Sequence, residues 1–382
     1  MQVCSKCGNQ NINYFGYDKF NKPYCRLCLS FNKESAPLKI KDSNKQFKLT
    51  LDYQLSEKQE KASNQILESF KNKKDCLIYA VCGAGKTELV YKTIKYALNN
   101  KLQVGFCIPR KDVVIELVPR LKNAFKEANI TSVYGGNSNN LTGDIILLTT
   151  HQLYRYNHFF DLLIIDETDA FPFRGNQTLN SFFRKSIKGN YIMMSATPLE
   201  ENIQEIKNNN GTYITLMERY HHHPLIVPKV KVFPFGAFLY LVYKAKLFQR
   251  KNLPFLIFSP TIDSVEELFK KLNIFIKNGN YVHSKRENRE QIINDFKNNK
   301  YQYLVTSSIL ERGITIKNLQ VIIFNADNNV YESNTLIQIS GRVGRKIDAW
   351  DGEVIYICSK TNYDIIESIK KIKEANLNVA HM

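Results

Sequence analysis

Hydrophobic residues along the chain fall into short continuous runs that are separated by longer amphipathic stretches. From about residue 49, apolar runs such as CLIYAVC (76–82), QVGFCIP (103–109) and DLLIIDE (161–167) alternate with helix-like stretches such as residues 57–70. Continuous apolar strands separated by helices are typical of a parallel sheet that helices cover on both faces. The pattern therefore predicts an α/β fold.

The same alternation begins again after RYHHHPLIVPK, residues 219–229, with strand-like runs such as FLIFSP, YLVTSS and EVIYICS. We therefore expect two α/β domains in tandem, the first at residues 49–218 and the second at 219–382. Ahead of them, residues 1–32 contain few aliphatic side chains and indicate a small separate module. The Lys-rich residues 33–48 indicate a basic linker between the module and the first domain.

The composition is that of a folded protein with a polyanionic partner. Of the 382 residues, 43% are hydrophobic and 23% are charged, and 53 Lys and Arg against 36 Asp and Glu leave a net charge of +17. Such a charge favours a nucleic-acid partner, although biased base composition would also enrich the chain in Lys, Asn and Ile. No signal peptide opens the chain and its apolar runs are too short to span a bilayer, so we expect a cytosolic protein.

AVCGAGKT, residues 80–87, lies between a strand-like run and a helix-like one, which is the context that a phosphate-binding loop requires. Gly83 and Gly85 would let backbone N–H groups turn toward the phosphates. Lys86 would reach the β- and γ-phosphates of ATP, and the Thr87 hydroxyl would ligate Mg²⁺. The alternative is an ordinary glycine-containing turn between a strand and a helix.

LLIIDETDAF, residues 162–171, sets three carboxylates against a buried strand, which is costly unless a cation or a hydrogen-bond donor compensates them. A nucleotide with Mg²⁺ needs an acidic residue at the end of a neighbouring parallel strand. Asp166 would hold the metal, and Glu167 would orient or deprotonate the attacking water. Asp169 is then available to bridge to the group that senses the γ-phosphate. The alternative is a strand that runs out into a solvated turn.

QISGRVGR, residues 338–345, carries Arg342 and Arg345 three positions apart, each preceded by glycine. On a helix, this spacing places both guanidinium groups on one face. An arginine stabilises charge on a transferring phosphoryl group better than a lysine does. The alternative, a basic helix face that only aids solubility, leaves the glycines and Gln338 unexplained.

Four of the eight cysteines, Cys4, Cys7, Cys25 and Cys28, form the pattern C-x₂-C-x₁₇-C-x₂-C near the N-terminus. This spacing is typical of a zinc site with four thiolate ligands, and disulfides are disfavoured in a reducing compartment. We therefore predict one Zn²⁺ in residues 1–32. The run HHH at 221–223 predicts no metal site, because adjacent side chains of an extended segment cannot all face one ion.

Together these motifs resemble the superfamily 2 helicases and translocases, which implies two RecA-like domains and DNA-dependent ATP hydrolysis. SAT (195–197) resembles the coupling motif of that superfamily, and TSSILERGIT (306–315) resembles the segment that links nucleotide to nucleic acid. IPRK (108–111) and TTHQL (149–153) occupy the places of first-domain contacts to the strand backbone.

LSEKQ, residues 55–59, has two interpretations. Ser56 and Gln59 form a capping-box pattern for the helix that follows. The superfamily also places a glutamine about 25 residues before its phosphate loop to read adenine. By this resemblance, the expected nucleotide contacts are Gln59, Gly83, Ala84, Gly85, Lys86, Thr87, Gly313 and Gln338, the coupling residues are Asp169, Ser195 and Thr197, and the DNA contacts are Arg110, Thr150, Thr306 and Arg312.

The combination of the cysteine module with five motifs is more specific and resembles the ComFA family, the ATPases of bacterial DNA uptake. The motifs are DETDAFPF, MMSATP, RYHHHPLIVPK, ILERGIT and GRVGR. That resemblance implies an ATP-driven motor on single-stranded DNA at the inner face of the cytoplasmic membrane. The implied partners are the competence membrane channel, a phosphoribosyltransferase-like competence protein and a strand-binding recombination mediator. The implied cofactors are ATP, Mg²⁺ and Zn²⁺.

Two other functions remain open at this point. One is a replication-restart or repair helicase that separates duplex DNA. The other is a zinc-stapled binding module in which the nucleotide only switches the conformation, although a pure switch has no need of Glu167, Arg342 and Arg345. RNA also remains a possible ligand, because contacts to the backbone alone separate it poorly from DNA. The sequence does not predict the oligomeric state.

Overall fold

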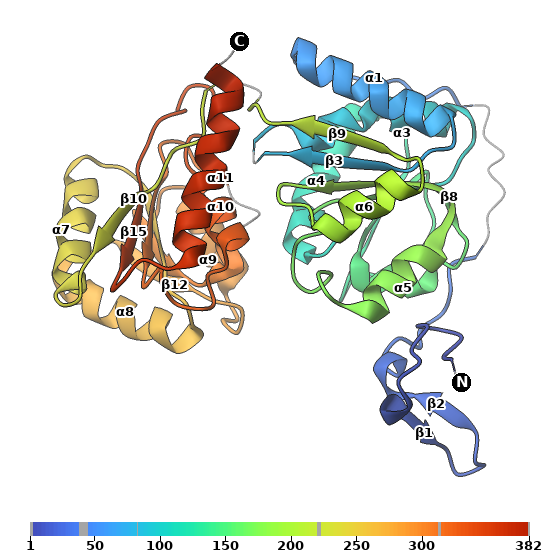
Figure 1. The fold of residues 1–382 in the computed structure, drawn as a ribbon, viewed down its shortest axis with the longest axis horizontal. Helices are drawn as coiled ribbons and strands as arrows, with labels where there is room; N and C mark the ends of the chain where they lie inside the picture. The colour runs from blue at the N-terminus through green and yellow to red at the C-terminus, as the bar shows by residue number, and fades with distance from the viewer. Residues whose placement is uncertain (1–2, 38–44, 82, 220–222, 312–314, 381–382) are drawn as a thin grey trace. The chain divides into compact units, whose positions relative to one another are not determined.

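Two compact units make up the chain (Figure 1). The computed structural model describes residues 3–37, 45–81, 83–219, 223–311 and 315–380. One unit comprises residues 1–80 and 85–216, and the other comprises residues 81–84 and 217–382. A parallel sheet with helices around it is the framework of each unit, so the α/β class predicted from the apolar runs is confirmed.

The first unit contains a small N-terminal module and a larger α/β part. The elements of the module are η1 (Ile12–Tyr14), β1 (Phe15–Tyr17), β2 (Pro23–Cys25) and η2 (Arg26–Cys28). The strands of the α/β part are β3 (Cys76–Ala80), β4 (Val104–Ile108), β5 (Ile130–Val133), β6 (Ile145–Thr149), β7 (Phe160–Ile165), β8 (Ile187–Ser195) and β9 (Thr212–Leu216). Its helices are α1 (Glu57–Lys71), α2 (Lys86–Leu89), α3 (Tyr91–Asn99), α4 (Lys111–Ala124), η3 (Thr150–Arg155), α5 (Gln177–Ser186) and α6 (Glu200–Asn208).

Within the described residues, the seven strands of the α/β part are all parallel and lie in the order β5-β6-β4-β7-β8-β3-β9. Every position of β4 and β6 is buried, because helices cover both faces of the sheet. Leu163 of β7 packs in one core cluster with Phe182 of α5. Ile164, the next residue along β7, is also buried but points to the opposite face. Continuous apolar runs therefore follow from burial on both sides.

The N-terminal module packs against the α/β part of the same unit. The ring of Phe31 lies 5.0 Å from the ring of Phe182 in α5 and 5.3 Å from that of Tyr154 in η3, measured between centroids. The Lys185 ammonium donates hydrogen bonds to the backbone carbonyls of Ser5 and Lys6. Residues far apart in the sequence thus share one core.

The second unit has its own sheet. Its strands are β10 (Lys229–Val232), β11 (Phe255–Phe258), β12 (Gly279–Val282), β13 (Tyr303–Thr306), β14 (Gln320–Phe324) and β15 (Val354–Cys358). Its helices are α7 (Ala237–Arg250), α8 (Ile262–Phe275), α9 (Arg289–Lys297), η4 (Ser308–Glu311), α10 (Ser333–Ser340) and α11 (Tyr363–Ala380). Across the part of the chain that the structure describes, no helix is both long and apolar enough to cross a bilayer.

The six strands described in the second unit are parallel, in the order β10-β15-β14-β11-β13-β12. Successive residues of β11 enter different cores. Leu256 and Phe258 pack with residues of α9, α10 and α11, whereas Phe255 and Ile257 pack with residues of α7 and α8. The sheet is therefore sandwiched between two helical layers, as its uninterrupted apolar strands require.

Candidate functional site

The predicted phosphate loop follows β3, and α2 begins at its end. Gly83 and Gly85 have φ angles of +85° and +76°, a region that side chains other than glycine rarely adopt. The Lys86 ammonium donates a hydrogen bond to the carbonyl oxygen of Ala80 at 3.0 Å, so its side chain folds back over the loop. Thr87 is half-buried in α2, and Cys82 lies outside the described residues.

Asp166 and Glu167 occupy a sharp turn directly after β7. The backbone N–H of Asp166 donates to the carbonyl of Cys107 in β4 at 2.9 Å, and Asp166 Oδ1 accepts the N–H of Glu167 at 2.8 Å. Glu167 has a φ of +59°, which is unfavourable for a residue with a side chain and is often found at functional sites. The turn fixes the direction of both carboxylates at the carboxyl end of the sheet.

The expectation that these carboxylates follow a strand next to the phosphate-loop strand is wrong. β8 lies between β7 and β3, with Leu77 of β3 opposite Met193 of β8, and Ile164 of β7 opposite Ile192 on its other side. The carboxyl ends of all three parallel strands still meet at one edge. The intervening strand instead contributes Ser195, its last residue, to the site.

Asp169, Ser195 and Thr197 form one hydrogen-bonded cluster. The Ser195 hydroxyl donates to Oδ1 of Asp169 at 2.7 Å, and the Thr197 hydroxyl donates to Oδ2 at 2.8 Å. The Thr197 N–H donates to Ser195 Oγ at 2.9 Å. All three side chains are buried, where hydrogen bonds to a charged carboxylate are strong. The structure thus brings the three predicted coupling residues together, and it links the turns after β7 and β8.

The two predicted catalytic arginines lie in a turn and not on a helix, so the expectation of a shared helix face is wrong. α10 ends at Ser340 with Gly341 as its C-cap, and Gly344 has a φ of +69°. Glycine ends helices readily because it lacks a side chain. Arg342 is 2% exposed, and Nε of the more exposed Arg345 donates to the Gly341 carbonyl at 2.9 Å.

Arg219 holds this turn in place, a role that the sequence did not reveal. Its guanidinium is buried, and Nη1 donates to the carbonyls of Val343 at 3.0 Å and Gly344 at 2.6 Å. Nη2 donates to the carbonyl of Gly341 at 3.4 Å. The only sequence signal was an arginine at the start of RYHHHPLIVPK, a run that marks the domain boundary and contributes to the family resemblance. A fork of donors on three carbonyls fixes the backbone that carries Arg345.

Gln59 has the capping-box contacts and also faces the phosphate loop. Gln59 N–H donates to Ser56 Oγ at 3.3 Å, and Gln59 Oε1 accepts the Ser56 N–H at 2.9 Å, which confirms the box. Gln59 Nε2 lies 2.6 Å from the point where a Cβ on Gly85 would stand. The cap therefore positions the amide beside the loop, and its contact with adenine stays a prediction.

The residues predicted to contact DNA or the distal parts of the nucleotide lie in varied surroundings. Arg110 is the N-cap residue of α4 and is half-buried. Thr150 and Thr306 are fully buried, and the Thr306 hydroxyl donates to the Ser307 carbonyl at 3.1 Å. Gln338 is buried in α10, whereas Arg312 and Gly313 lie outside the described residues. Their roles stay predictions.

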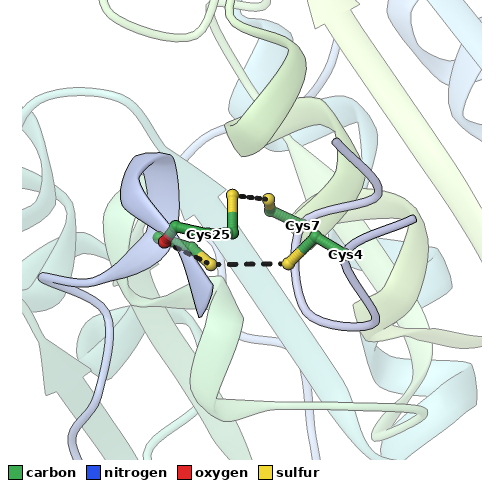
Figure 2. Close-up of side chains that lie close together, drawn as sticks. Cys4, Cys7 and Cys25 are labelled. Carbon is green, nitrogen blue, oxygen red and sulfur yellow. Dashed lines mark hydrogen bonds between the residues drawn. The ribbon is translucent and has the colours of Figure 1, made fainter. Parts of the chain in front are cut away.

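The four N-terminal cysteines form one cluster. Figure 2 shows the sulfur atoms of Cys4, Cys7 and Cys25 turned toward one another, and with Cys28 all four Sγ atoms lie within 4.8 Å of each other. The Cys4–Cys28 and Cys7–Cys25 sulfur pairs are each 3.6 Å apart. Four sulfurs around one zinc at 2.3 Å would be separated by about 3.8 Å. The cluster therefore fits a structural zinc ion.

The electrostatics of the cluster also favour a cation. Burial is the largest of the causes that raise the pKa of Cys7 to about 11. A backbone hydrogen bond of Asn9 opposes this shift, and the neighbouring thiols of Cys4 and Cys25 add to it. Several thiolates this close therefore need a positive charge among them, which a zinc ion supplies.

The HHH run predicted no metal site, and one of its members lies within the described residues. The ring of this residue, His223, stacks on the ring of Trp350 with centroids 4.1 Å apart.

Comparisons with known proteins agree with this geometry. Residues 52–200 match the family model described as "Type III restriction enzyme, res subunit", and residues 239–346 match the "Helicase conserved C-terminal domain". "Competence protein ComFA" of Bacillus subtilis is 34% identical over 98% of this chain and 85% of the relative. "Competence protein ComFA" of Streptococcus pneumoniae is 32% identical over 98% of this chain and 90% of the relative.

The chain belongs to the ComFA family of competence proteins. The resemblance predicted from the cysteine module and the motor motifs is thereby confirmed. A more distant relative, the transcription-repair-coupling factor of Staphylococcus aureus, is 22% identical over 86% of this chain and 30% of its own length.

Solved structures show the same fold at low identity. "S. cerevisiae Dbp5 bound to RNA and ADP BeF3" has a TM-score of 0.67 and 18% identity, and covers 84% of this chain and 88% of that one. "Structure of RecG bound to three-way DNA junction" has a TM-score of 0.60 and 19% identity, and covers 86% of this chain and 47% of that one. With the domain matches, this ComFA family member is a superfamily 2 ATPase with two RecA-like domains.

We expect Lys86→Ala to reduce ATP turnover about 100-fold or more, because no other group on the loop replaces the charge opposite the phosphates. Steady-state ATP hydrolysis by the purified full chain measures this. Lys95→Ala, an exposed lysine in α3 of the same unit, is the matched control and should keep full turnover. Substantial activity in Lys86→Ala would show that the site is assigned wrongly.

Cys25→Ser should release the zinc ion and loosen the N-terminal module, while ATP turnover without nucleic acid is retained. Metal analysis of the purified protein should give about one zinc per chain for the wild type and none for the variant. Limited proteolysis should then cut within the first 37 residues. Cys358→Ser, a buried cysteine in the second unit, should keep its zinc. Equal zinc in all three proteins would contradict the assignment.

Proposed function

We propose that the chain is an ATP-dependent single-stranded DNA translocase that drives or assists the uptake of transforming DNA across the cytoplasmic membrane. The observation that carries the proposal is the match to two competence proteins over 98% of the chain, which spans the cysteine module and both α/β units. The first unit supports the motor part of the proposal, since Lys86 follows the predicted phosphate loop and Asp166 and Glu167 follow β7, and these are residue types that ATP hydrolysis uses.

ATP would be held by the phosphate loop and by the turn after β7. On this proposal, Lys86 binds the β- and γ-phosphates and Thr87 and Asp166 hold the magnesium ion, which neutralises the charge that develops on the phosphates. Glu167 orients the attacking water and takes its proton. The strained backbone of Glu167 supports this role, because it directs the side chain independently of the strand.

Two rigid polar clusters would convert ATP binding into motion. The Asp169 carboxylate, tied to Ser195 and Thr197, links the strand that carries Asp166 to the next strand. The turn held by Arg219 carries Arg345, which we assign to stabilising charge on the transferring phosphoryl group. Binding and hydrolysis of ATP would then shift the population between two arrangements of the units, and thereby move the DNA.

DNA would be the polyanion that the net charge of +17 attracts. By family resemblance, we place the protein at the inner face of the cytoplasmic membrane, where its partners are the competence channel, a phosphoribosyltransferase-like competence protein and a strand-binding recombination mediator. Zn²⁺ would stabilise the N-terminal module that packs on α5 and η3. The segment TTHQL, which contains the first residues of η3, is predicted to contact the strand backbone.

A repair-type or replication-restart DNA helicase is the second candidate. The match to the transcription-repair-coupling factor supports it, although that match covers only 30% of the relative. Separation of duplex strands by the purified protein would favour this function over DNA uptake.

Steady-state ATP hydrolysis with single-stranded DNA, duplex DNA, RNA or no nucleic acid, at one stated salt concentration, tests the proposal. We expect single-stranded DNA to stimulate turnover about tenfold or more over the other conditions. A fluorophore at one end of the strand should then report arrival of the translocating protein. Equal stimulation by duplex DNA or RNA would favour the helicase, and no stimulation by any of them would contradict a DNA-driven motor.

Arg345→Ala should lower kcat at saturating ATP by about 100-fold, because it removes charge stabilisation that is needed mainly in the transition state. ATP affinity, measured by displacement of a fluorescent nucleotide, should stay within about threefold of the wild type. Lys346→Ala removes the neighbouring exposed cation and should leave both quantities unchanged. A loss of affinity without a loss of kcat would contradict the role given to Arg345.

A further inference from the structure

Glu88 places a carboxylate in the interior of the first unit, directly after Lys86 and Thr87 in α2. Its Oε1 accepts hydrogen bonds from the Tyr53 hydroxyl at 3.0 Å and from Nη2 of Arg120 at 2.6 Å. Its Oε2 is buried and has no hydrogen-bond partner among the described residues. A buried carboxylate oxygen without a donor is costly, so Oε2 points to a ligand group that donates a hydrogen bond.

The two partners of Oε1 fix the direction of Oε2. Tyr53 precedes α1 and Arg120 lies in α4, so the carboxylate is held from two separate elements. Arg120 offers only donors. Burial, and next the negative charge of Glu88, raise the pKa of Tyr53 well above its usual value, so its hydroxyl stays protonated at neutral pH. Rotation of the carboxylate would lose both hydrogen bonds.

A second polar group, the amide of Gln59, also lies close to Gly85 of the phosphate loop. A Cβ added to Gly85 would lie 2.6 Å from Gln59 Nε2 and 3.4 Å from Glu88 Oε2. Because Gln59 Oε1 accepts the N–H of Ser56, the amide nitrogen is the end turned toward Gly85. One donor and one acceptor therefore lie close to the same glycine of the phosphate loop.

This pair of groups matches one purine and not the other. Adenine presents the acceptor N7 beside the donating 6-amino group, whereas guanine presents two acceptors, N7 and O6. We propose that Glu88 selects adenine over guanine nucleotides by accepting a hydrogen bond from the 6-amino group, beside N7 as the acceptor for Gln59, whose contact with adenine the superfamily resemblance already implies. The proposal rests on the proposed function in one respect, since it takes the phosphate loop as the nucleotide site. A guanine would place O6 against the carboxylate oxygen, and two acceptors repel.

Glu88→Gln tests the proposal sharply because both partners of Oε1 are donors. Tyr53 and Arg120 would hold the amide oxygen at the Oε1 position, which places the NH₂ group where Oε2 stood. The acceptor becomes a donor of nearly the same shape. We expect kcat/KM to fall about tenfold for ATP and to rise about tenfold for GTP, with kcat for ATP within about twofold of the wild type. Steady-state hydrolysis of both nucleotides by the full chain measures this.

A matched control and an independent measurement accompany the variant. Glu57→Gln changes an exposed carboxylate in the first turn of α1 and should leave the ATP-to-GTP ratio unchanged. Purine riboside 5′-triphosphate lacks the 6-amino group, so the wild type should use it about tenfold less well than ATP. Glu88→Gln should use the two nucleotides equally well, since it no longer accepts that hydrogen bond.

Two results would overturn the assignment. One is an unchanged ATP-to-GTP ratio in Glu88→Gln, even if both activities fall, which would mean that Glu88 only supports the fold. The other is equal use of ATP and purine riboside triphosphate by the wild type. This comparison needs no variant, so it tests the role of Glu88 even if Glu88→Gln does not fold. Displacement of a fluorescent nucleotide gives the same ratios without turnover or DNA. A failure of DNA stimulation would therefore count against the proposed function alone.

Discussion

The site depends on one buried carboxylate, Asp169, that is tied to two hydroxyl groups. Both strands that it joins, β7 and β8, are parallel and covered by helices on both faces, so their carboxyl ends open at a common edge of the sheet. A charged group at such an edge is stable only when donors surround it. Ser195 and Thr197 supply those donors at 2.7 and 2.8 Å, and so the turn after one strand is fixed to the turn after the next. The turn that carries Asp166 and Glu167 is therefore connected through Asp169 to the end of β8.

Other polar groups of the first unit are likewise held by hydrogen bonds before a ligand binds. The Lys86 ammonium bonds to the Ala80 carbonyl, and the Glu88 carboxylate bonds to Tyr53 and Arg120. The Glu88 carboxylate is held in one direction by partners outside the loop, whereas Lys86 is held by Ala80, the first residue of the loop, so both groups are ordered before a ligand binds. Such preorganisation is the main way in which proteins stabilise developing charge. The Oε2 atom of Glu88 stands apart among these groups, because its geometry is fixed while its hydrogen-bonding capacity is unused.

Sequence patterns predicted the parts of the fold that burial determines by itself. Strands such as β4 and β6 are buried at every position, so their apolar runs are unmistakable, and the Ser56–Gln59 capping box needs only local contacts. The short outer strand β5 alternates buried and half-buried residues, and β10 is largely exposed, so neither stands out. The end of α10 at Ser340 and the insertion of β8 between β7 and β3 were not predictable either. Both depend on contacts between distant residues.

The partners of Arg219 and Glu88 show why a motif identifies reacting groups more readily than the groups that position them. A reacting group must lie at a fixed spacing from its loop or turn, so it leaves a pattern such as GAGKT or GRVGR. A supporting side chain needs only to form a hydrogen bond with the loop or turn that carries the motif. It can therefore come from any helix, strand or loop of the chain. Arg219 lies 122 residues before Gly341, and Tyr53 lies 35 residues before Glu88. Arg219 donates to the carbonyls of Val343 and Gly344 in the turn beyond α10 and to that of Gly341, the C-cap of α10, so a single side chain fixes the arginine turn next to the helix end, where the dipole favours a cation. The groups that position the candidate site therefore come partly from residues that only the folded structure brings together.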